Sequence, residues 1–372
     1  MSAKWGMLMF AITALSIYLG GYAYIAWRVN AGFNLQAPYK WYLYAAVAVL
    51  AVISITALFG ARSGMPGISV IGPLGYILMG VWGMTLTLFI LNDAVNAFNL
   101  IFKIKSFRYY STIVTLGLSV LGCAWALINV AFILNIKEIK IKVPDLPVDS
   151  LRIVQLTDLH INSFTSHKNI KKIFSKVMGL NPDIIVFTGD IIDTDINEGD
   201  KFLEYGFDHL RAKYGMYAVT GNHEYYASLE SYLEKSKKLG IKVLQNESVQ
   251  AANIINIAGV NDSDVRNPVA VKKALSAINP ALPTLFLSHQ PESFDVASAQ
   301  GHSIIQLSGH THAGQIPPIE IVRRLMKYNY GLYENKNSKM YVSSGTRWWG
   351  PPMRLFNFSE IVVLTLEKAE NR

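Results

Sequence analysis

Five places between residues 158 and 312 carry histidine, aspartate or asparagine in patterns that could bind metal ions. In chain order they are Asp158 and His160, Asp190, Asn222 and His223, His289, and His310 and His312. Each place follows a short apolar run, which is the pattern of a buried strand. Imidazole nitrogens combined with carboxylate and amide oxygens suit Mn²⁺, iron or Zn²⁺ better than Ca²⁺. A single H-x-H is weak evidence, but five strand ends that carry one kind of chemistry indicate a metal site.

The segments that carry these residues are typical of an α/β domain. Ile136–Val143 alternates Ile or Val with Lys or Glu, which predicts a half-exposed strand. Asn169–Leu180 has the apolar spacing of a helix and stops before Pro182. Helices alternate with strands at first, and strands dominate later. Because ligands of open α/β sheets gather at the carboxyl ends of strands, we expect the five places to meet.

The order of the motifs resembles that of the calcineurin-like metallophosphoesterases. The motifs are D-x-H at Asp158–His160, G-D at Gly189-Asp190, G-N-H-E at Gly221–Glu224, the lone His289 and G-H-x-H at Gly309–His312. The flanking stretches GDIID, GNHEYY and GHTHAGQI are most similar to the bacterial membrane-associated branch. The resemblance covers about residues 136–367. It implies a four-layer α/β/β/α metallophosphoesterase sandwich with a two-metal centre at the edge of its sheets, and hydrolysis of a phosphate ester by a metal-activated hydroxide.

The resemblance also implies a role for each motif residue. One divalent ion would be held by Asp158, His160 and His312, and the other by Asn222, His289 and His310. Asp190 would bridge the two ions, which would be Mn²⁺, Fe²⁺/Fe³⁺ or Zn²⁺. Alternate spacing at a strand end allows His310 and His312 to reach different ions. His223 would be the catalytic general acid that protonates the leaving oxygen.

Other polar residues near the motifs are interpreted as structural. Glu224 is expected to support a metal ligand or to cap a helix rather than to act in catalysis. Asp193 and Asp195 are interpreted as loop or helix-capping residues, and Asp262 and Asp264 as part of a turn. Surface positions are expected for His167, His209 and His302.

Residues 1–136 are predicted to form an all-α four-helix transmembrane region, followed by the metallophosphoesterase domain at residues 137–372. Four apolar stretches approach the roughly 20 residues needed to cross a bilayer. They are Trp5–Trp27, Tyr42–Phe59, Ile68–Leu91 and Thr112–Ile136, and none contains a charged residue. Asp93 is expected at the membrane interface. Several glycines and Pro73 in the third stretch indicate close helix packing or a kink.

Charge and cysteine content restrict the possible partners. The net charge of +8 is spread thinly, without the dense basic run that favours nucleic acid. It fits attraction to anionic lipid or a phosphorylated substrate, or simply a solvated basic surface. Cys123 is the single cysteine, so no disulfide can form within the chain. Five basic residues lie on each side of the spans, so the rule that basic loops stay in the cytoplasm gives no preference. If the lysines at 137–142 belong to a folded strand, they count less, and an external catalytic domain is favoured.

Together these features favour a dinuclear-metal phosphoesterase that is an integral protein of the bacterial cytoplasmic (inner) membrane. Its substrate would be a phosphodiester or pyrophosphate of a phosphorylated lipid or small envelope molecule. A UDP-diacylglucosamine-type pyrophosphatase and a nucleotide phosphoesterase are alternatives within enzymology. A catalytically idle membrane sensor or scaffold is the alternative outside it, against which the complete ligand set argues.

Two later segments could contribute specificity. Residues 317–336, with Arg323, Arg324 and Lys327 among apolar residues, are interpreted as a helix, either at a membrane interface or on the domain surface. Residues 345–356 place Trp348 and Trp349 in a Gly/Pro loop between two arginines. Exposed vicinal tryptophans favour a lipid-contacting or pocket-lining role, with burial against the sheet edge as the alternative.

Overall fold

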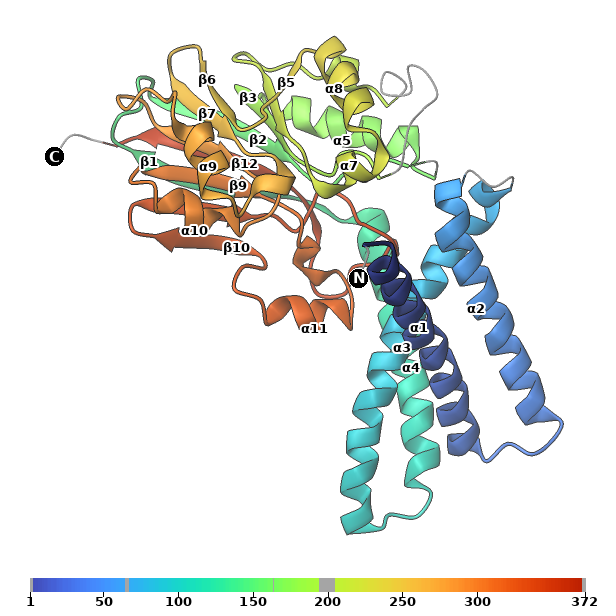
Figure 1. The fold of residues 1–372 in the computed structure, drawn as a ribbon. Helices are drawn as coiled ribbons and strands as arrows, with labels where there is room; N and C mark the ends of the chain where they lie inside the picture. Colours follow the sequence, from blue (N-terminus) through green and yellow to red (C-terminus); the bar gives the residue numbers. More distant parts are fainter. Residues whose placement is uncertain (1–2, 64–66, 163, 194–204, 370–372) are drawn as a thin grey trace. The chain divides into compact units, whose positions relative to one another are not determined.

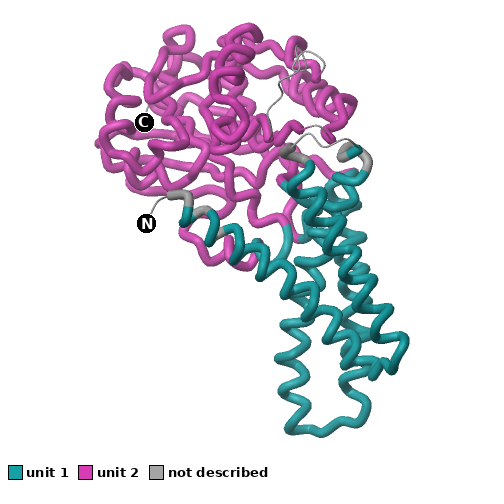
Figure 2. Tube along the Cα trace, turned by 45° about the vertical axis from the view of Figure 1, so that its right-hand side comes forward, with its two compact units in different colours: residues 1–131, 316–319, 350–355 teal, residues 132–315, 320–349, 356–372 magenta. Residues whose placement is uncertain are grey.

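The computed structural model describes residues 3–63, 67–162, 164–193 and 205–369, which form two compact units (Figures 1 and 2). The helical unit contains Met1–Ala131 together with Ile316–Ile319 and Gly350–Leu355. The two-sheet unit contains Phe132–Gln315, Glu320–Trp349 and Phe356–Arg372. Two short segments of the later sequence therefore pack with the helices.

Four long helices build the helical unit. They are α1 (Ala3–Phe33), α2 (Tyr39–Ser63), α3 (Ile68–Phe102) and α4 (Phe107–Phe132). Within the described residues, three segments are long and apolar enough to cross a membrane: Tyr39–Gly60, Ile71–Phe102 and Phe107–Phe132. A membrane-spanning role for α1 stays a prediction from the sequence.

Glycines allow these helices to approach one another closely. A Cβ added to Gly75 of α3 would lie 3.1 Å from the carbonyl oxygen of Ile53 in α2. A Cβ added to Gly21 of α1 would lie 2.7 Å from Nε1 of Trp82 in α3. The second distance is too short for an ordinary side chain and the first is tighter than most, so the close packing predicted for the third span is confirmed.

Two charged residues lie just beyond the ends of the predicted spans and pair with each other. Arg28 of α1 forms an ion pair with Asp93 of α3, and the Tyr24 hydroxyl donates a hydrogen bond to the same carboxylate. The helices continue past Trp27 and Leu91, where the predicted spans end, and so both charges lie within helices. Such residues are tolerated among apolar helices when they neutralise each other.

Two six-stranded sheets build the other unit. The first has the order β1 (Leu134–Val143), β12 (Ser359–Lys368), β2 (Ser150–Leu156), β3 (Ile184–Thr188), β4 (Met216–Val219) and β5 (Ile241–Val243). The second has the order β10 (Gly331–Asn335), β11 (Ser338–Val342), β9 (Ile304–Ser308), β8 (Thr284–Leu287), β7 (Ile255–Gly259) and β6 (Glu247–Ala251). Strands β2 to β5 are parallel to one another, as are β7, β8 and β9.

Helices cover the outer face of each sheet. They are α5 (His167–Gly179), α7 (Asn222–Ala227) and α8 (Leu229–Lys238) with the first sheet, and α9 (Pro268–Leu275) and α10 (Ser293–Ser298) with the second. A last short helix, α11, covers Ile319–Arg324. The four-layer α/β/β/α sandwich predicted from the sequence is confirmed.

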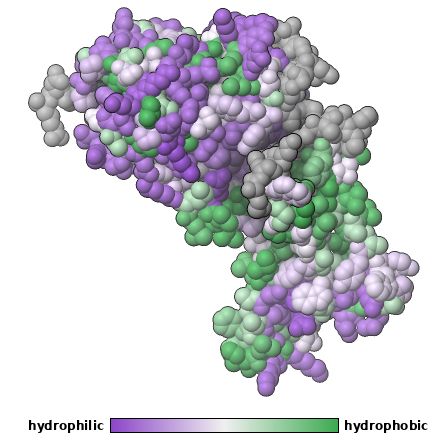
Figure 3. Space-filling model, in the orientation of Figure 1, coloured by the Kyte–Doolittle hydropathy of each residue, from purple (hydrophilic) through white to green (hydrophobic). Residues whose placement is uncertain are grey.

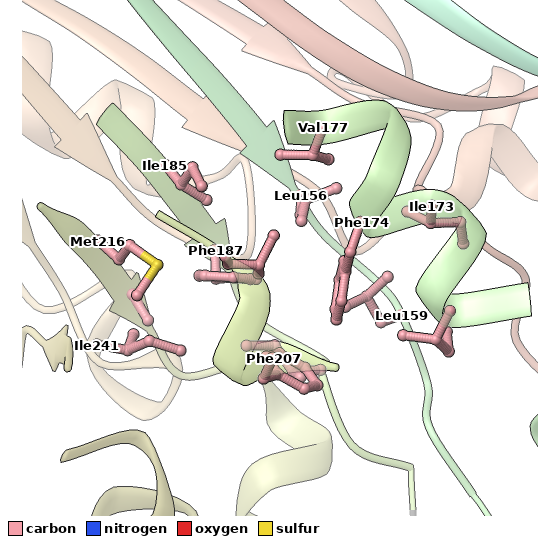
Figure 4. Packing of buried hydrophobic residues seen from close by; sticks show 14 of the residues in the cluster. Leu156, Leu159, Ile173, Phe174, Val177, Ile185, Phe187, Phe207, Met216 and Ile241 are labelled. Atoms are coloured by element: carbon pink, nitrogen blue, oxygen red, sulfur yellow. The ribbon is translucent and has the colours of Figure 1, made fainter. Parts of the chain in front are cut away.

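The layers form because buried strands are apolar on both faces. In β3, Ile184 and Val186 join the core between the sheets. The alternate residues Ile185 and Phe187 point outward and pack near Phe174 of α5 (Figure 4). A period of two thus supplies both cores from one strand.

Some expected element ends need correction. The predicted fourth span reached Ile136, but α4 ends at Phe132 and Leu134 already belongs to β1. The reason is pairing, since Leu134 and Ile136 lie in register with Ser359 and Ile361 of the parallel strand β12. The helix predicted for residues 317–336 is also too long. It ends at Arg324, and residues 331–335 form β10 of a hairpin with β11.

Candidate metal centre

The predicted ligands lie within a few residues of the ends of β2, β3, β4, β8 and β9. Backbone hydrogen bonds join these ends, including Asp158 N to Gly189 O at 3.1 Å and Gly309 N to His289 O at 3.0 Å. Five of the ligands have left-handed backbone conformations: Asp158, His160, Asp190, His310 and His312. Such a conformation costs roughly 1–3 kcal/mol per residue outside glycine. Strain of this kind concentrates at functional sites, where the surrounding structure holds it.

The first ligand cluster contains Asp158, His160 and His312. Each offers a ligand atom within 4.8 Å of the others. Nε2 of His312 lies 3.2 Å from Oδ1 of Asp158 and 3.1 Å from Nε2 of His160. The structure thus brings together the three residues assigned to the first ion.

The second cluster contains Asp190, His289 and His310. Nε2 of His289 lies 3.1 Å from Oδ2 of Asp190 and 3.2 Å from Nδ1 of His310. The Nδ1–H of His289 donates to the carbonyl oxygen of Thr188 at 2.8 Å. Because that bond fixes the proton on Nδ1, Nε2 carries the lone pair that a metal ion needs.

Asp190 connects the two clusters. Its Oδ2 lies 3.6 Å from Nε2 of His160 in the first cluster and 3.1 Å from Nε2 of His289 in the second. Its Oδ1 accepts a hydrogen bond from the backbone N–H of His223 at 3.0 Å. One carboxylate therefore reaches both clusters, as a bridging ligand must.

Asn222 supplies an independent sign that a cation fits here. It is the first residue of α7, and its Oδ1 is buried with no hydrogen-bond partner among the described residues. A buried acceptor without a partner is costly unless an ion or water satisfies it. In each cluster, moreover, two imidazole nitrogens face each other at 3.1–3.2 Å. Imidazole nitrogens that converge in this way fit metal ions.

The electrostatic environment also keeps the predicted ligands in protonation states that can bind cations. Burial alone would raise the pKa of Asp158, but the imidazoles of His312, His289 and His160 hold it below its usual range. Burial would also raise the pKa of Asp190, but nearby histidines, chiefly His289, lower it below its usual value. Burial, and after it the neighbouring His289, lower the pKa of His310 to about 3, so the His310 imidazole stays neutral and one ring nitrogen keeps a lone pair.

Asp193 was interpreted from the sequence as a loop or capping residue, which is wrong. Its side chain is 10% exposed, and Oδ1 lies 2.8 Å from Nδ1 of His223 and 3.3 Å from Nδ1 of His160. Burial lowers the pKa of His223, but the hydrogen bond to Asp193 and the charges of Asp190 and Asp193 outweigh burial and raise it. Asp193 thus orients a metal ligand and the predicted general acid. Asp195 lies outside the described residues.

The double-tryptophan loop lines the site with one of its two rings. The Trp349 ring centroid lies 5.9 Å from that of His223 and 6.5 Å from that of His160. Gln315 holds Trp349 by hydrogen bonds to its backbone N–H and carbonyl at 2.7 and 3.0 Å. Trp348 instead packs under the guanidinium of Arg347 at 4.4 Å. Trp349 therefore borders the predicted metal-binding and catalytic histidines.

The arginines of this loop face inward rather than toward lipid. Arg347 is buried and donates to the carbonyl oxygen of Leu159 at 2.6 Å and to Thr165 Oγ1 at 3.2 Å. Arg354 is also buried, in the helical unit. Arg347 therefore supports the loop that carries His160.

The remaining polar residues have the structural positions predicted for them. Asp262 and Asp264 lie in a short 3-10 turn, where Asp262 accepts from the Gln290 amide at 2.9 and 3.0 Å. The side chains of His167, His209 and His302 are exposed.

Glu224 braces the loops that carry the ligands. Its fully buried carboxylate accepts the backbone N–H groups of Asp190, Ile191, Ile192 and Gly221 at 2.9, 2.8, 3.2 and 2.7 Å. One side chain thus connects the loop after β3 to the start of α7. A supporting and capping role, as predicted, accounts for all four contacts.

Removing this brace should destabilise the two-sheet unit. The Glu224→Ala variant leaves four buried N–H groups without their acceptor, at a cost of at least about 3 kcal/mol. Denaturant unfolding of the full chain in detergent, followed by tryptophan fluorescence, measures the loss. The exposed Glu230 of α8 is the matched control, and Glu230→Ala should change stability by less than about 0.5 kcal/mol. Equal stability of the two variants would contradict the bracing role.

The fold and the ligand set define a class of protein: an α/β sandwich with a metal site of histidines and aspartates at the strand ends. Comparison with known proteins agrees. Residues 151–314 match the family described as calcineurin-like phosphoesterase. An uncharacterized metallophosphoesterase of Helicobacter pylori is 34% identical over 260 residues, which cover 67% of this chain and 68% of that protein. The chain belongs to the calcineurin-like metallophosphoesterase family.

A second relative is named as a transmembrane protein. A "Transmembrane protein with metallophosphoesterase domain" of Danio rerio is 31% identical over 284 residues, covering 72% of this chain. The chain matches 65% of the length of that protein. A solved dimetal phosphatase of Danio rerio is 11% identical, with a TM-score of 0.38 over 59% of this chain and 93% of that one. Likeness at that level says nothing about substrate.

Proposed function

We propose that this chain is a membrane-anchored phosphoesterase with a dinuclear metal centre. Its substrate would be a phosphodiester or pyrophosphate of a phosphorylated lipid or small envelope molecule. The observation that carries the proposal is the position of Asp190, whose Oδ2 is close to histidines of both clusters. Apolar helices in the same chain support a substrate that resides in or near a membrane.

The ligands divide between two ions in this proposal. Asp158, His160 and His312 hold one ion, Asn222, His289 and His310 hold the other, and Asp190 contributes to both. When bound, two Mn²⁺, iron or Zn²⁺ ions supply the Lewis acidity that activates water and neutralises phosphate charge. The hydrogen bond from Nδ1 of His289 to Thr188 and the contact between Nδ1 of His160 and Asp193 keep these rings oriented.

His223 is the proposed general acid. Asp193 accepts its Nδ1–H at 2.8 Å, which fixes the ring and leaves Nε2 as the nitrogen that holds the transferable proton. The rings of Trp349 and Tyr226 lie 5.9 and 5.3 Å from the His223 ring and shield it from bulk water. Nε2 of His223 donates its proton to the leaving oxygen, which completes the cleavage of the ester.

The position of three lysines supports an external location for the two-sheet unit. Lys137, Lys140 and Lys142 belong to β1, a strand of that unit, and so do not count as loop charges flanking the membrane. The remaining basic residues then favour the opposite loops on the cytoplasmic side of a bacterial inner membrane. Protease added outside spheroplasts should cleave the two-sheet unit, whereas full protection of it would contradict this side.

The substrate class can be tested with the full chain in detergent. Purified protein loaded with Mn²⁺ is incubated with a bacterial lipid extract, and products are identified by mass spectrometry. We expect a phosphorylated lipid to lose a headgroup or phosphate, with no change when the Asp190→Asn variant is used. Turnover of bis(p-nitrophenyl) phosphate without turnover of any lipid would overturn the lipid assignment but keep the phosphoesterase.

A further inference from the structure

The segment that follows the G-H-T-H motif exposes a cluster of large apolar side chains. The cluster, here called the α11 patch, consists of Ile319, Ile321, Val322, Leu325, Met326 and Phe356. Leu325 is 85% exposed and Val322 is 60% exposed. Hydrophobic residues also gather over this element in Figure 3, at the place where Figure 1 labels α11. Single exposed apolar residues are ordinary, but a cluster of six indicates an interaction surface.

The charges around the α11 patch favour an anionic partner. Residues 319–327 contain Arg323, Arg324 and Lys327; Arg324 pairs with Glu320 and Lys327 with Asp295 of α10, which leaves one positive charge, that of Arg323, in excess. The guanidinium of Arg324 lies 5.7 Å from the ring centroid of Phe356. Basic side chains around exposed aliphatic ones are typical of helices that lie in a membrane interface. Their long stems can rest on lipid while the charged ends reach the headgroups.

Both ends of the α11 patch continue directly from segments of the helical unit. Ile319, the first residue of α11, ends the segment Ile316–Ile319 of that unit. A Cβ added to Gly83 of α3 would lie 2.9 Å from the carbonyl oxygen of Pro317. Phe356 directly follows Leu355, whose carbonyl oxygen accepts from Trp125 Nε1 of α4 at 3.0 Å. The covalent chain therefore keeps the patch within a few residues of α3 and α4.

The points of attachment lie about one hydrocarbon thickness from the far ends of these helices. Lys103, Lys105 and Arg108 in and beside the loop between α3 and α4 mark the far membrane surface. From Gly83 to Phe102, the last residue of α3, the helix rises about 28 Å, and from Phe107 to Trp125 of α4 it rises about 27 Å. The hydrocarbon core of a bilayer is about 30 Å thick. Gly83 and Trp125 thus lie about one hydrocarbon thickness from that basic loop, and the apolar segment of α3 continues back to Ile71.

We propose that the α11 patch inserts into the boundary between headgroups and acyl chains of an anionic bilayer. The apolar side chains enter the lipid, and Arg323 contacts phosphates. Insertion also holds the metal-binding loop at the lipid surface, because Gln315 bonds Trp349 and Ile316 follows it directly. The inference does not depend on the proposed activity.

Spin labels on the full chain test the insertion. The native thiol is removed by Cys123→Ala, and a nitroxide is attached in turn to Leu325→Cys, Val322→Cys and Val269→Cys. Val269 of α9 is the matched control, since it is an apolar residue 76% exposed outside the α11 patch. Each protein is reconstituted in nanodiscs of equal parts phosphatidylcholine and phosphatidylglycerol. Electron paramagnetic resonance then measures collisions with oxygen, which dissolves in lipid, and with a water-soluble nickel chelate.

Insertion predicts that labels at 322 and 325 collide more often with oxygen and at least about tenfold less often with nickel than the label at 269. Collision rates equal to those at 269 would overturn the proposal. Low rates with both reagents would also overturn it, because they indicate burial against protein. The two patch positions guard against a local disturbance at either one.

Discussion

Replacing Asp190 with asparagine is expected to abolish phosphodiester hydrolysis and to lower bound metal from two ions per chain to at most one. The substitution removes the negative charge of the Asp190 carboxylate, whose Oδ2 lies near His160 and His289. Loss of a residue that only supports a ligand costs roughly 10- to 100-fold in metal affinity or activity. Loss of a ligand shared by both ions should cost more than about 100-fold. Elemental analysis and hydrolysis of bis(p-nitrophenyl) phosphate measure the two effects.

Asp145→Asn is the matched control for this prediction, because Asp145 is exposed in the turn after β1. The control should retain both ions and full activity. Asparagine at 190 still offers an oxygen to the backbone N–H of His223, so the fold should survive. A variant that keeps two ions and normal turnover would show that Asp190 is not the bridge.

Replacing His223 with asparagine is expected to lower kcat by about 10²–10⁴-fold while both metal ions stay bound. His223 contacts Asp193 and belongs to neither of the clusters assigned to the two ions, although it forms a third group of possible ligands with His160 and Asp193. The matched control is His209→Asn, since the His209 side chain is 74% exposed. Its activity should equal that of the unmodified chain.

The leaving group distinguishes proton transfer from a structural role. Nitrophenolate leaves without much help from an acid, whereas an alkoxide must be protonated. The loss in His223→Asn should therefore be larger for an alkyl phosphodiester than for bis(p-nitrophenyl) phosphate. Equal losses with both substrates, or loss of metal, would exclude His223 as the general acid.

A double variant separates the two contacts of Asp193. Asp193→Asn alone should cost roughly 10- to 100-fold in kcat. If Asp193 acts through His223, the same change in a His223→Asn background should cost far less, since residues that act as a unit are not additive. Additive losses would instead assign the effect to the contact with His160.

The fold, and the meeting of most of the predicted ligand residues, could be predicted from the sequence because they depend on local patterns. Each ligand follows an apolar run directly, and parallel strands bring their carboxyl ends together. The distance from Asp158 to His312 along the chain is long, yet each lies a few residues past a buried strand. Order and position on the strands were therefore enough to expect that they meet.

Asp193 could not be distinguished in the same way. A carboxylate in a polar loop after a strand has the same pattern whether it caps a helix or bonds a histidine. Its position depends on pairing of the loops after β2 and β3, where Ile161 and Ile192 form a bridge. A possible signal was its place three residues after Asp190, within the same motif. The inward direction of Arg347 likewise depends on backbone carbonyls that no local pattern indicates.

Metal stoichiometry measured against activity tests the central claim most directly. The purified full chain is stripped by a chelator and titrated with Mn²⁺, while bound metal and phosphodiester hydrolysis are followed together. Two ions per chain are expected, with activity that appears mainly as the second ion binds. Full activity in the stripped protein, or with a single ion bound, would contradict a dinuclear phosphoesterase.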